Sequence, residues 1–261
     1  MVPKNFQKKI LKNGITMLHE YRGLPIVSFS ITNKFGGAYE ESKIKGIAHV
    51  MEHLVFTGTK TRTHEDISRE IEKKGGILNA FTSNEVTSFW FKLPSEHLFS
   101  GMDIIVDMLT NPIFEEKKFE KEKKVIIEEI KMYHDSPQRF VFDKIEENLF
   151  DKPLGEGVIG SEETINALKR DFVFDFFKKM YNPSNFIVTL VGKADFNKVC
   201  GYMEKNFKPS ENIPKIKTIK KHNKETTEYR PGIDQAHLVF AFHAPLQTDK
   251  NYPALEVLDA Y

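Results

Sequence analysis

One short string limits what this chain can fold into more than any other: His49-Val50-Met51-Glu52-His53. Apolar residues recur around it at helical spacing and predict an amphipathic helix over about residues 44–56. On such a helix the two histidines lie about 40° apart, and Glu52 lies about 60° to the other side. One arc therefore presents two imidazoles and a carboxylate, and the opposite arc is apolar. The fold must supply a core for one face and a polar site for the other.

Two imidazoles one helical turn apart are typical ligands of a catalytic zinc ion, and a carboxylate beside them can act as general base toward a zinc-bound water. The alternative is that His49, Glu52 and His53 are ordinary surface residues of an amphipathic helix. We favour zinc, because this combination of residues rarely arises by chance in a chain of this composition.

A second helix, from Phe119 to Tyr133, offers a third ligand. Glu122 and Glu129 fall about 20° apart on its apolar stripe, whereas Glu128 falls on the opposite, lysine-rich side. Burying a carboxylate without a partner costs several kcal/mol, so a metal ion or a metal-bound histidine would explain the position. The pattern therefore selects Glu129 over Glu128 as a ligand. Alternatively, both carboxylates lie at the edge of the stripe and are solvated.

The chain has 261 residues, 40% of them hydrophobic and 29% charged, which is enough for a large folded core. Runs rich in β-branched and aromatic residues predict strands at 15–20, 26–35, 77–82, 85–93 and 186–191, with a hairpin around Ser83-Asn84. Helical patterns cover 44–56, 63–75, most of 96–149, 162–180 and 196–207. Thr63 is the expected N-cap of the second of these helices, and Asn111-Pro112 and Ser136-Pro137 are expected breaks.

Residues 208–232 contain three prolines and six lysines without an apolar period, which predicts an interdomain linker. Residues 1–207 would form a zinc-bearing α/β domain. Residues 233–261 would supply the first strand, at 236–244, and the start of a helix of a second domain. Because that helical pattern reaches Tyr261 without a cap, we expect this second domain to be truncated.

The charge balance, with 38 Lys and Arg against 37 Asp and Glu, indicates neither a nucleic-acid partner nor a membrane surface. The single cysteine, Cys200, cannot form an intramolecular disulfide and is expected to be a small buried residue rather than a nucleophile. No secretory pattern is recognisable at the N-terminus, so we expect a cytoplasmic protein.

These motifs together resemble the pitrilysin/insulinase family of zinc metallopeptidases, whose inverted zinc motif is H-x-x-E-H. In that family a glutamate lies about 75 residues after the motif, with another glutamate seven residues before it, and Glu122 and Glu129 match this pair. The resemblance is strongest to the mitochondrial processing peptidase type and its bacterial counterparts. It extends to Gly46-Ile47-Ala48, Leu78-Asn79-Ala80-Phe81-Thr82-Ser83 and Tyr181-Asn182-Pro183-Ser184-Asn185.

The resemblance implies an α+β fold, with helices packed on one face of a mixed, mainly antiparallel sheet and a second similar domain following. It implies that His49, His53 and Glu129 hold one Zn²⁺ per chain. Glu52 would then be the general base, and Glu122 would orient a ligand histidine. Substrate peptide would add as an extra strand beside residues 78–82, and the expected contacts are Asn79, Ala80 and Phe81. The alternative for these three residues is an ordinary β-hairpin.

The resulting prediction is a zinc-dependent metalloendopeptidase that cleaves peptides or unfolded segments. Family members have two similar halves, and this chain contains the first half with only the opening of the second. The leading alternative is therefore a zinc-containing, peptide-binding half that is inactive without a second half-domain or a homologous subunit in a dimer. A structural protein without metal is the remaining alternative.

Overall fold

A six-stranded mixed sheet with the strand order β1-β2-β6-β3-β5-β4 is the centre of the fold in the computed structural model, which describes residues 5–209, 219–232 and 234–261. The strands are β1 (Phe6–Ile10), β2 (Thr16–Glu20), β3 (Ile26–Asn33), β4 (Ile77–Thr82), β5 (Thr87–Pro94) and β6 (Phe186–Gly192). β2 and β6 run parallel, and the other neighbouring strands are antiparallel. The expected α+β class with a mainly antiparallel sheet is confirmed.

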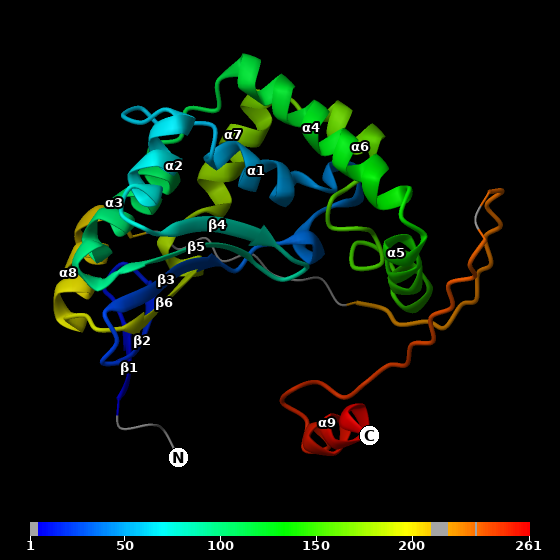
Figure 1. The fold of residues 1–261 in the computed structure, drawn as a ribbon. Coiled ribbons are helices and arrows are strands. Elements are labelled where there is room, and N and C mark those ends of the chain that lie inside the picture. The colour runs from blue at the N-terminus through cyan, green and yellow to red at the C-terminus, as the bar shows by residue number, and fades with distance from the viewer. Residues whose placement is uncertain (1–4, 210–218, 233) are drawn as a thin grey trace.

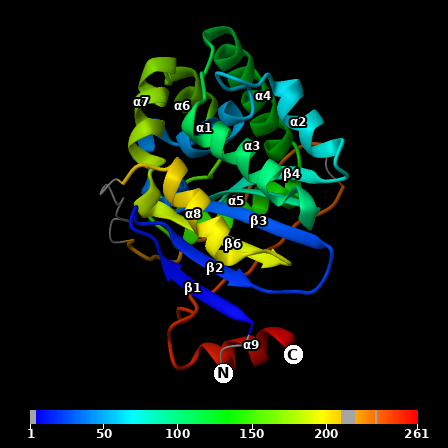
Figure 2. The same cartoon turned by 90° about the vertical axis from the view of Figure 1, so that its left-hand side faces the viewer.

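Most of the helices lie on one face of this sheet (Figures 1 and 2). They are α1 (Ile47–Val55), α2 (His64–Glu72), α3 (Leu98–Thr110), α4 (Glu116–His134), α5 (Pro137–Leu149), α6 (Glu162–Ala167), α7 (Arg170–Met180), α8 (Phe196–Asn206) and α9 (Tyr252–Ala260). Both views show α1, α2, α3, α4 and α7 on the same side of the sheet, whereas α9, near the C-terminus, lies on the other side and away from it (Figures 1 and 2). Thr63 caps α2 as expected, through a capping box with Asp66.

The core lies between the sheet and these helices, because strand and helix periods place apolar side chains on facing surfaces. From β3, alternate residues Val27, Phe29 and Ile31 are fully buried. From α1, the buried residues include Val50, Met51 and Leu54. The apolar arc of α1 therefore packs on the sheet, and its histidine-bearing arc faces away from the core.

The structure differs from the sequence predictions in several places. The helix expected over 162–180 is divided into α6 and α7, because the backbone adopts an extended conformation at Leu168. The buried ammonium group of Lys123 donates hydrogen bonds to the carbonyl oxygens of Asn166 and Leu168 at this break. On α4, the helical period predicts that Val125 lies on the apolar stripe with Glu122 and Glu129, but the structure leaves Val125 44% exposed. The N-terminal strand β1 was not predicted.

The C-terminal part has little regular structure. The strand expected at 236–244 is not formed, because no described strand pairs with these residues. Residues 210–218 of the expected linker lie outside the described residues, and residues 219–232 run beside α5, where the Lys224 amide donates to Asn148 O at 2.9 Å. Helix α9 has no buried residue. Among the described residues, no helix has the length and apolar character needed to cross a membrane.

Candidate metal centre

Two helices bring the three predicted ligands together. α1 and α4 pack against each other above the sheet, with α1 next to β4 (Figure 1). His49 Nε2 lies 3.8 Å from Glu129 Oε2, and His53 Nε2 lies 3.7 Å from the same oxygen. One ligand atom from each of the three residues lies within 4.8 Å of the other two. Glu128 lies on the exposed side of α4 and pairs with Lys131 instead.

The spacing of these atoms fits a zinc ion. Ligand atoms at ordinary zinc distances in a tetrahedral site lie about 3.4 Å from one another. The two distances from Glu129 Oε2 to the histidine nitrogens, 3.8 and 3.7 Å, exceed this value by a few tenths of an ångström. All three residues are half-buried, so solvent still reaches part of each side chain. Three protein ligands and an open fourth position are the pattern of a catalytic rather than a structural zinc site.

The pKa values of the two histidines are shifted in opposite directions. Burial, together with the neighbouring His53, lowers the pKa of His49 to about 4, so this imidazole is neutral and free to donate a lone pair at neutral pH. Burial also acts to lower the pKa of His53, but the hydrogen bond with Glu122 and the charges of Glu52 and Glu129 outweigh it and raise the pKa. His53 Nδ1 lies 3.2 Å from Glu122 Oε2. Glu122 therefore lies where it can hold the outer nitrogen of a ligand histidine.

Glu52, the predicted base, forms a hydrogen bond with a residue of the sheet. The Thr82 hydroxyl, at the end of β4, donates to Glu52 Oε2 at 2.5 Å. Burial raises the pKa of Glu52, and the hydrogen bond from Thr82 works in the opposite direction. Sequence reasoning did not identify this contact, although the period of two along β4 places Thr82 on the same face as Leu78 and Ala80.

The strand β4, which carries the predicted substrate contacts, is an edge strand. Leu78 and Ala80 pack against the core, whereas Asn79 is exposed and Phe81 is 49% exposed on the opposite face. The Ala80 amide donates to Asn79 Oδ1 at 2.8 Å. β4 therefore ends beside Glu52, and its edge, unpaired among the described residues, forms the outer edge of the sheet.

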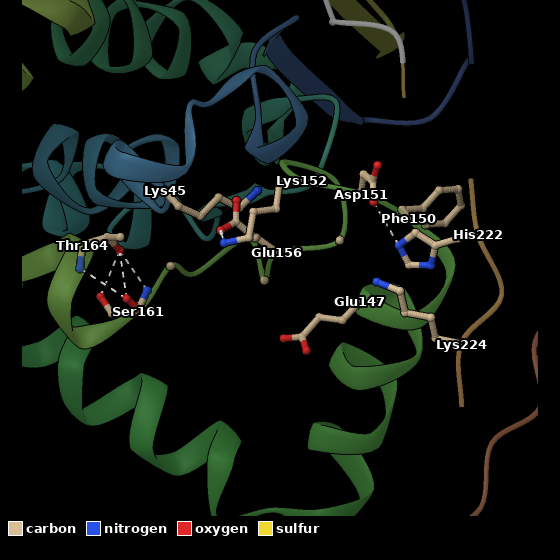
Figure 3. A pocket seen from close by; sticks show the side chains of 13 residues that line it. Lys45, Glu147, Phe150, Asp151, Lys152, Glu156, Ser161, Thr164, His222 and Lys224 are labelled. Carbon is tan, nitrogen blue, oxygen red and sulfur yellow. Dashed lines mark hydrogen bonds and ion pairs between the residues drawn. The ribbon is translucent and has the colours of Figure 1, made fainter. Parts of the chain in front are cut away.

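A cavity of about 790 Å³ lies elsewhere in the molecule, and none of the three candidate ligands lines it. α5, residues 150–164 and the segment around His222 surround it (Figure 3). Four of its lining side chains form two ion pairs: Lys152 with Glu156 at 2.7 Å, and His222 with Asp151 at 3.2 Å. Cys200 is buried, as expected.

Comparison with known families gives two matches that together cover most of the chain. The family described as Insulinase (Peptidase family M16) matches residues 17–162, which include His49, Glu52, His53, Glu122 and Glu129. The family described as Peptidase M16 inactive domain matches residues 167–261.

Individual relatives agree with this assignment. An uncharacterized zinc protease from Rickettsia bellii is 34% identical over 237 residues, which cover 86% of this chain and 58% of the relative. The beta subunit of the mitochondrial-processing peptidase from Saccharomyces cerevisiae is 33% identical over 201 residues, which cover 76% of this chain and 43% of the relative. This chain thus spans about half the length of the curated relatives it matches.

The fold agrees as well. The crystal structure of a protease from Helicobacter pylori superposes with a TM-score of 0.75 at 24% identity, over 81% of this chain and 54% of that one. The family match over residues 17–162 and the identity to the relatives show that this chain belongs to the insulinase family of peptidases, family M16.

Proposed function

We propose that this chain is the zinc-bearing half of a metalloendopeptidase that hydrolyses peptides or unfolded segments. The observation that carries the proposal is the convergence of His49, His53 and Glu129 within 4.8 Å, with each side chain only half-buried. The names of the relatives as zinc proteases support zinc as the metal. We infer one zinc ion per chain, because no second group of this kind exists among the described residues.

Each residue would have a distinct task. A zinc ion held by His49, His53 and Glu129 would supply a Lewis acid that polarises water and the scissile carbonyl. Glu52 takes the proton of the attacking water as the C–O bond forms, and it returns this proton to the amide nitrogen as the C–N bond breaks. Burial prepares Glu52 for both transfers, because it raises the pKa of the carboxyl toward neutrality.

The substrate would be bound through its backbone. An extended peptide can pair with the free edge of β4, so that main-chain hydrogen bonds align it irrespective of sequence. Asn79, Ala80 and Phe81 are the residues that we expect to contact it. Because Thr82 holds Glu52, a peptide aligned on this strand passes directly beside the base.

A second candidate function is a peptide-binding zinc half that cleaves only with a second half-domain or a homologous subunit. The observation that favours it is the length, because the chain covers 58% of the Rickettsia bellii relative. The yeast relative is by name one subunit of a processing peptidase. We propose a protein partner of this kind, and no nucleic acid or membrane partner.

The test compares the wild-type chain with Glu52→Gln on a pool of unstructured peptides. Glu128→Gln is the matched control, since this side chain is 73% exposed on α4. We expect equal zinc content in all three proteins, cleavage by the wild type and the control, and none by Glu52→Gln. Zinc binding with peptide binding but no cleavage by any of them would support the second candidate. Less than about 0.1 zinc per chain, with no uptake on adding zinc, would overturn both.

A further inference from the structure

Helix α1 begins without the usual N-terminal cap. The residue before it, Gly46, has φ 92° and no side chain that could accept a bond from the first turn. A Cβ atom at this position would lie 2.6 Å from the carbonyl oxygen of Ile159, so serine or aspartate, the common capping residues, cannot replace it. The free amides at the start of α1 must therefore be satisfied from elsewhere.

A buried carboxylate from outside the helix does this. Glu40, only 2% exposed, accepts hydrogen bonds from Ala48 N at 2.7 Å through Oε1 and from Gly46 N at 3.0 Å through Oε2. Ala48 directly precedes His49 in the sequence. One side chain thus determines where the backbone of α1 begins, one residue before the first candidate ligand.

Lys45 fixes this carboxylate to the rest of the fold. The Lys45 side chain is only 3% exposed, and its ammonium group lies 3.7 Å from Glu40 Oε2. It donates to Gly37 O at 2.8 Å and to Pro153 O at 2.9 Å. Figure 3 shows Lys45 at the wall of the cavity, on the side of Glu156. The start of α1 is therefore tied both to the loop after β3 and to the loop after α5.

A buried ion pair contributes little net stability, because desolvation cancels most of its attraction, and well-packed apolar residues often do as well. Its directional bonds do fix position. We propose that Glu40 and Lys45 are positioning residues of the metal centre, which set the start of α1 so that His49 and His53 lie opposite Glu129. This inference rests on the zinc site proposed above.

The test uses Glu40→Ala and Lys45→Met, with Thr63→Ala as the matched control. Thr63 caps α2, which contains none of the candidate ligands, so its loss removes a helix cap away from the metal centre. Zinc affinity is measured by competition with a chromophoric chelator. The visible spectrum of the cobalt-substituted protein is recorded for each variant, since it reports ligand geometry independently of activity.

We expect Glu40→Ala and Lys45→Met to weaken zinc binding by about tenfold or more, as is typical when groups that orient ligands are lost. We also expect a shifted cobalt spectrum. Thr63→Ala should change the affinity less than about twofold and leave the spectrum unchanged. Hydrogen exchange at Gly46 and Ala48 should accelerate in Glu40→Ala without metal, which verifies the cap itself.

The outcomes separate the two proposals. If the wild type binds zinc and the Glu40 and Lys45 variants match Thr63→Ala in affinity and spectrum, the positioning inference fails while the metal centre stands. If the wild type binds no zinc, the proposed function fails and the inference fails with it. Should Glu40→Ala not fold, Lys45→Met decides the question, because methionine keeps the length of the side chain.

Discussion

His53 Nδ1 and Glu122 Oε2 lie 3.2 Å apart, while the other nitrogen of the same imidazole faces Glu129 at 3.7 Å. Two carboxylates seven residues apart on α4 thus face the two sides of one histidine ring. In the tautomer that carries its proton on Nδ1, this N–H group donates to Glu122, and the lone pair of Nε2 is directed at the candidate metal position. The glutamate spacing in α4 and the tautomer of His53 are therefore parts of one arrangement.

Glu122→Gln should weaken zinc binding by about 10- to 100-fold without removing a ligand, because the amide holds the imidazole less strongly. Chelator competition at pH 7 measures this. The control is Glu120→Gln on the same helix, which is 54% exposed and should leave the affinity unchanged. An equal affinity for Glu122→Gln and wild type would exclude the orienting role.

Glu129→Gln should reduce zinc affinity by more than about 100-fold, because a direct ligand is lost. This loss is larger than the one expected for Glu122, which only orients a ligand. The zinc-dependent rise in the melting temperature should disappear with it. Glu128→Gln, one position away, should retain both properties. The reverse result, with Glu128 more sensitive than Glu129, would contradict the assignment.

Gly46→Ala should destabilise the fold more than Gly75→Ala. Both glycines have positive φ, so both variants lose about 1 kcal/mol to backbone strain. Only at Gly46 does the added Cβ meet the backbone, at 2.6 Å from Ile159 O, whereas nothing lies within 4 Å at Gly75. Urea unfolding should show an additional loss of about 1–3 kcal/mol for Gly46→Ala. Equal losses would mean that the loop around Ile159 adjusts freely.

Asp107 gives a pH-dependent prediction away from the metal centre. Burial alone would raise its pKa, but hydrogen bonds from Thr59, Asn111, Thr61 and Arg62 outweigh burial and hold the pKa below 3.8. The stability that these bonds contribute is therefore fully present above pH 3.8 and is lost as the pH falls through the folded-state pKa.

Asp107→Asn should accordingly cost about 2 kcal/mol at pH 7, because Arg62 loses a buried charged partner. The difference from wild type should shrink below pH 3.8. Chemical unfolding at a series of pH values measures both. Asp103→Asn is the control, since this partner of Arg62 is 56% exposed and should matter less. A difference that stays constant down to low pH would refute the assignment.

Local patterns predicted most of the individual elements. Thr63, the Ser83-Asn84 turn and the proline breaks at 112 and 137 are short-range signals, and the structure confirms the boundaries they set. The amphipathic pattern of α4 also distinguished Glu129 from Glu128. Each of these depends on residues within about two helical turns of one another, which a sequence displays directly.

Long-range relationships could not be predicted in the same way. Nothing in the sequence near Glu40 indicates that its carboxylate caps α1, because the reason lies in the close approach of Ile159 to Gly46. Likewise, the bond from Thr82 to Glu52 joins a strand and a helix 30 residues apart. The weak strand β1 is polar and largely exposed, so it lacks the apolar alternation by which strands are recognised.

The position of β6 has a consequence for the order in which the molecule forms during synthesis. β6 is the last of the six strands to leave the ribosome, yet it lies between β2 and β3 and pairs with both. Until it emerges, no described strand joins β1–β2 to β3–β5–β4, although His49, His53 and Glu129 have already been made. Joining them requires pairings between residues more than 150 positions apart, which are slow to form. A nascent chain can therefore carry all three candidate ligands and still lack the scaffold that brings them together.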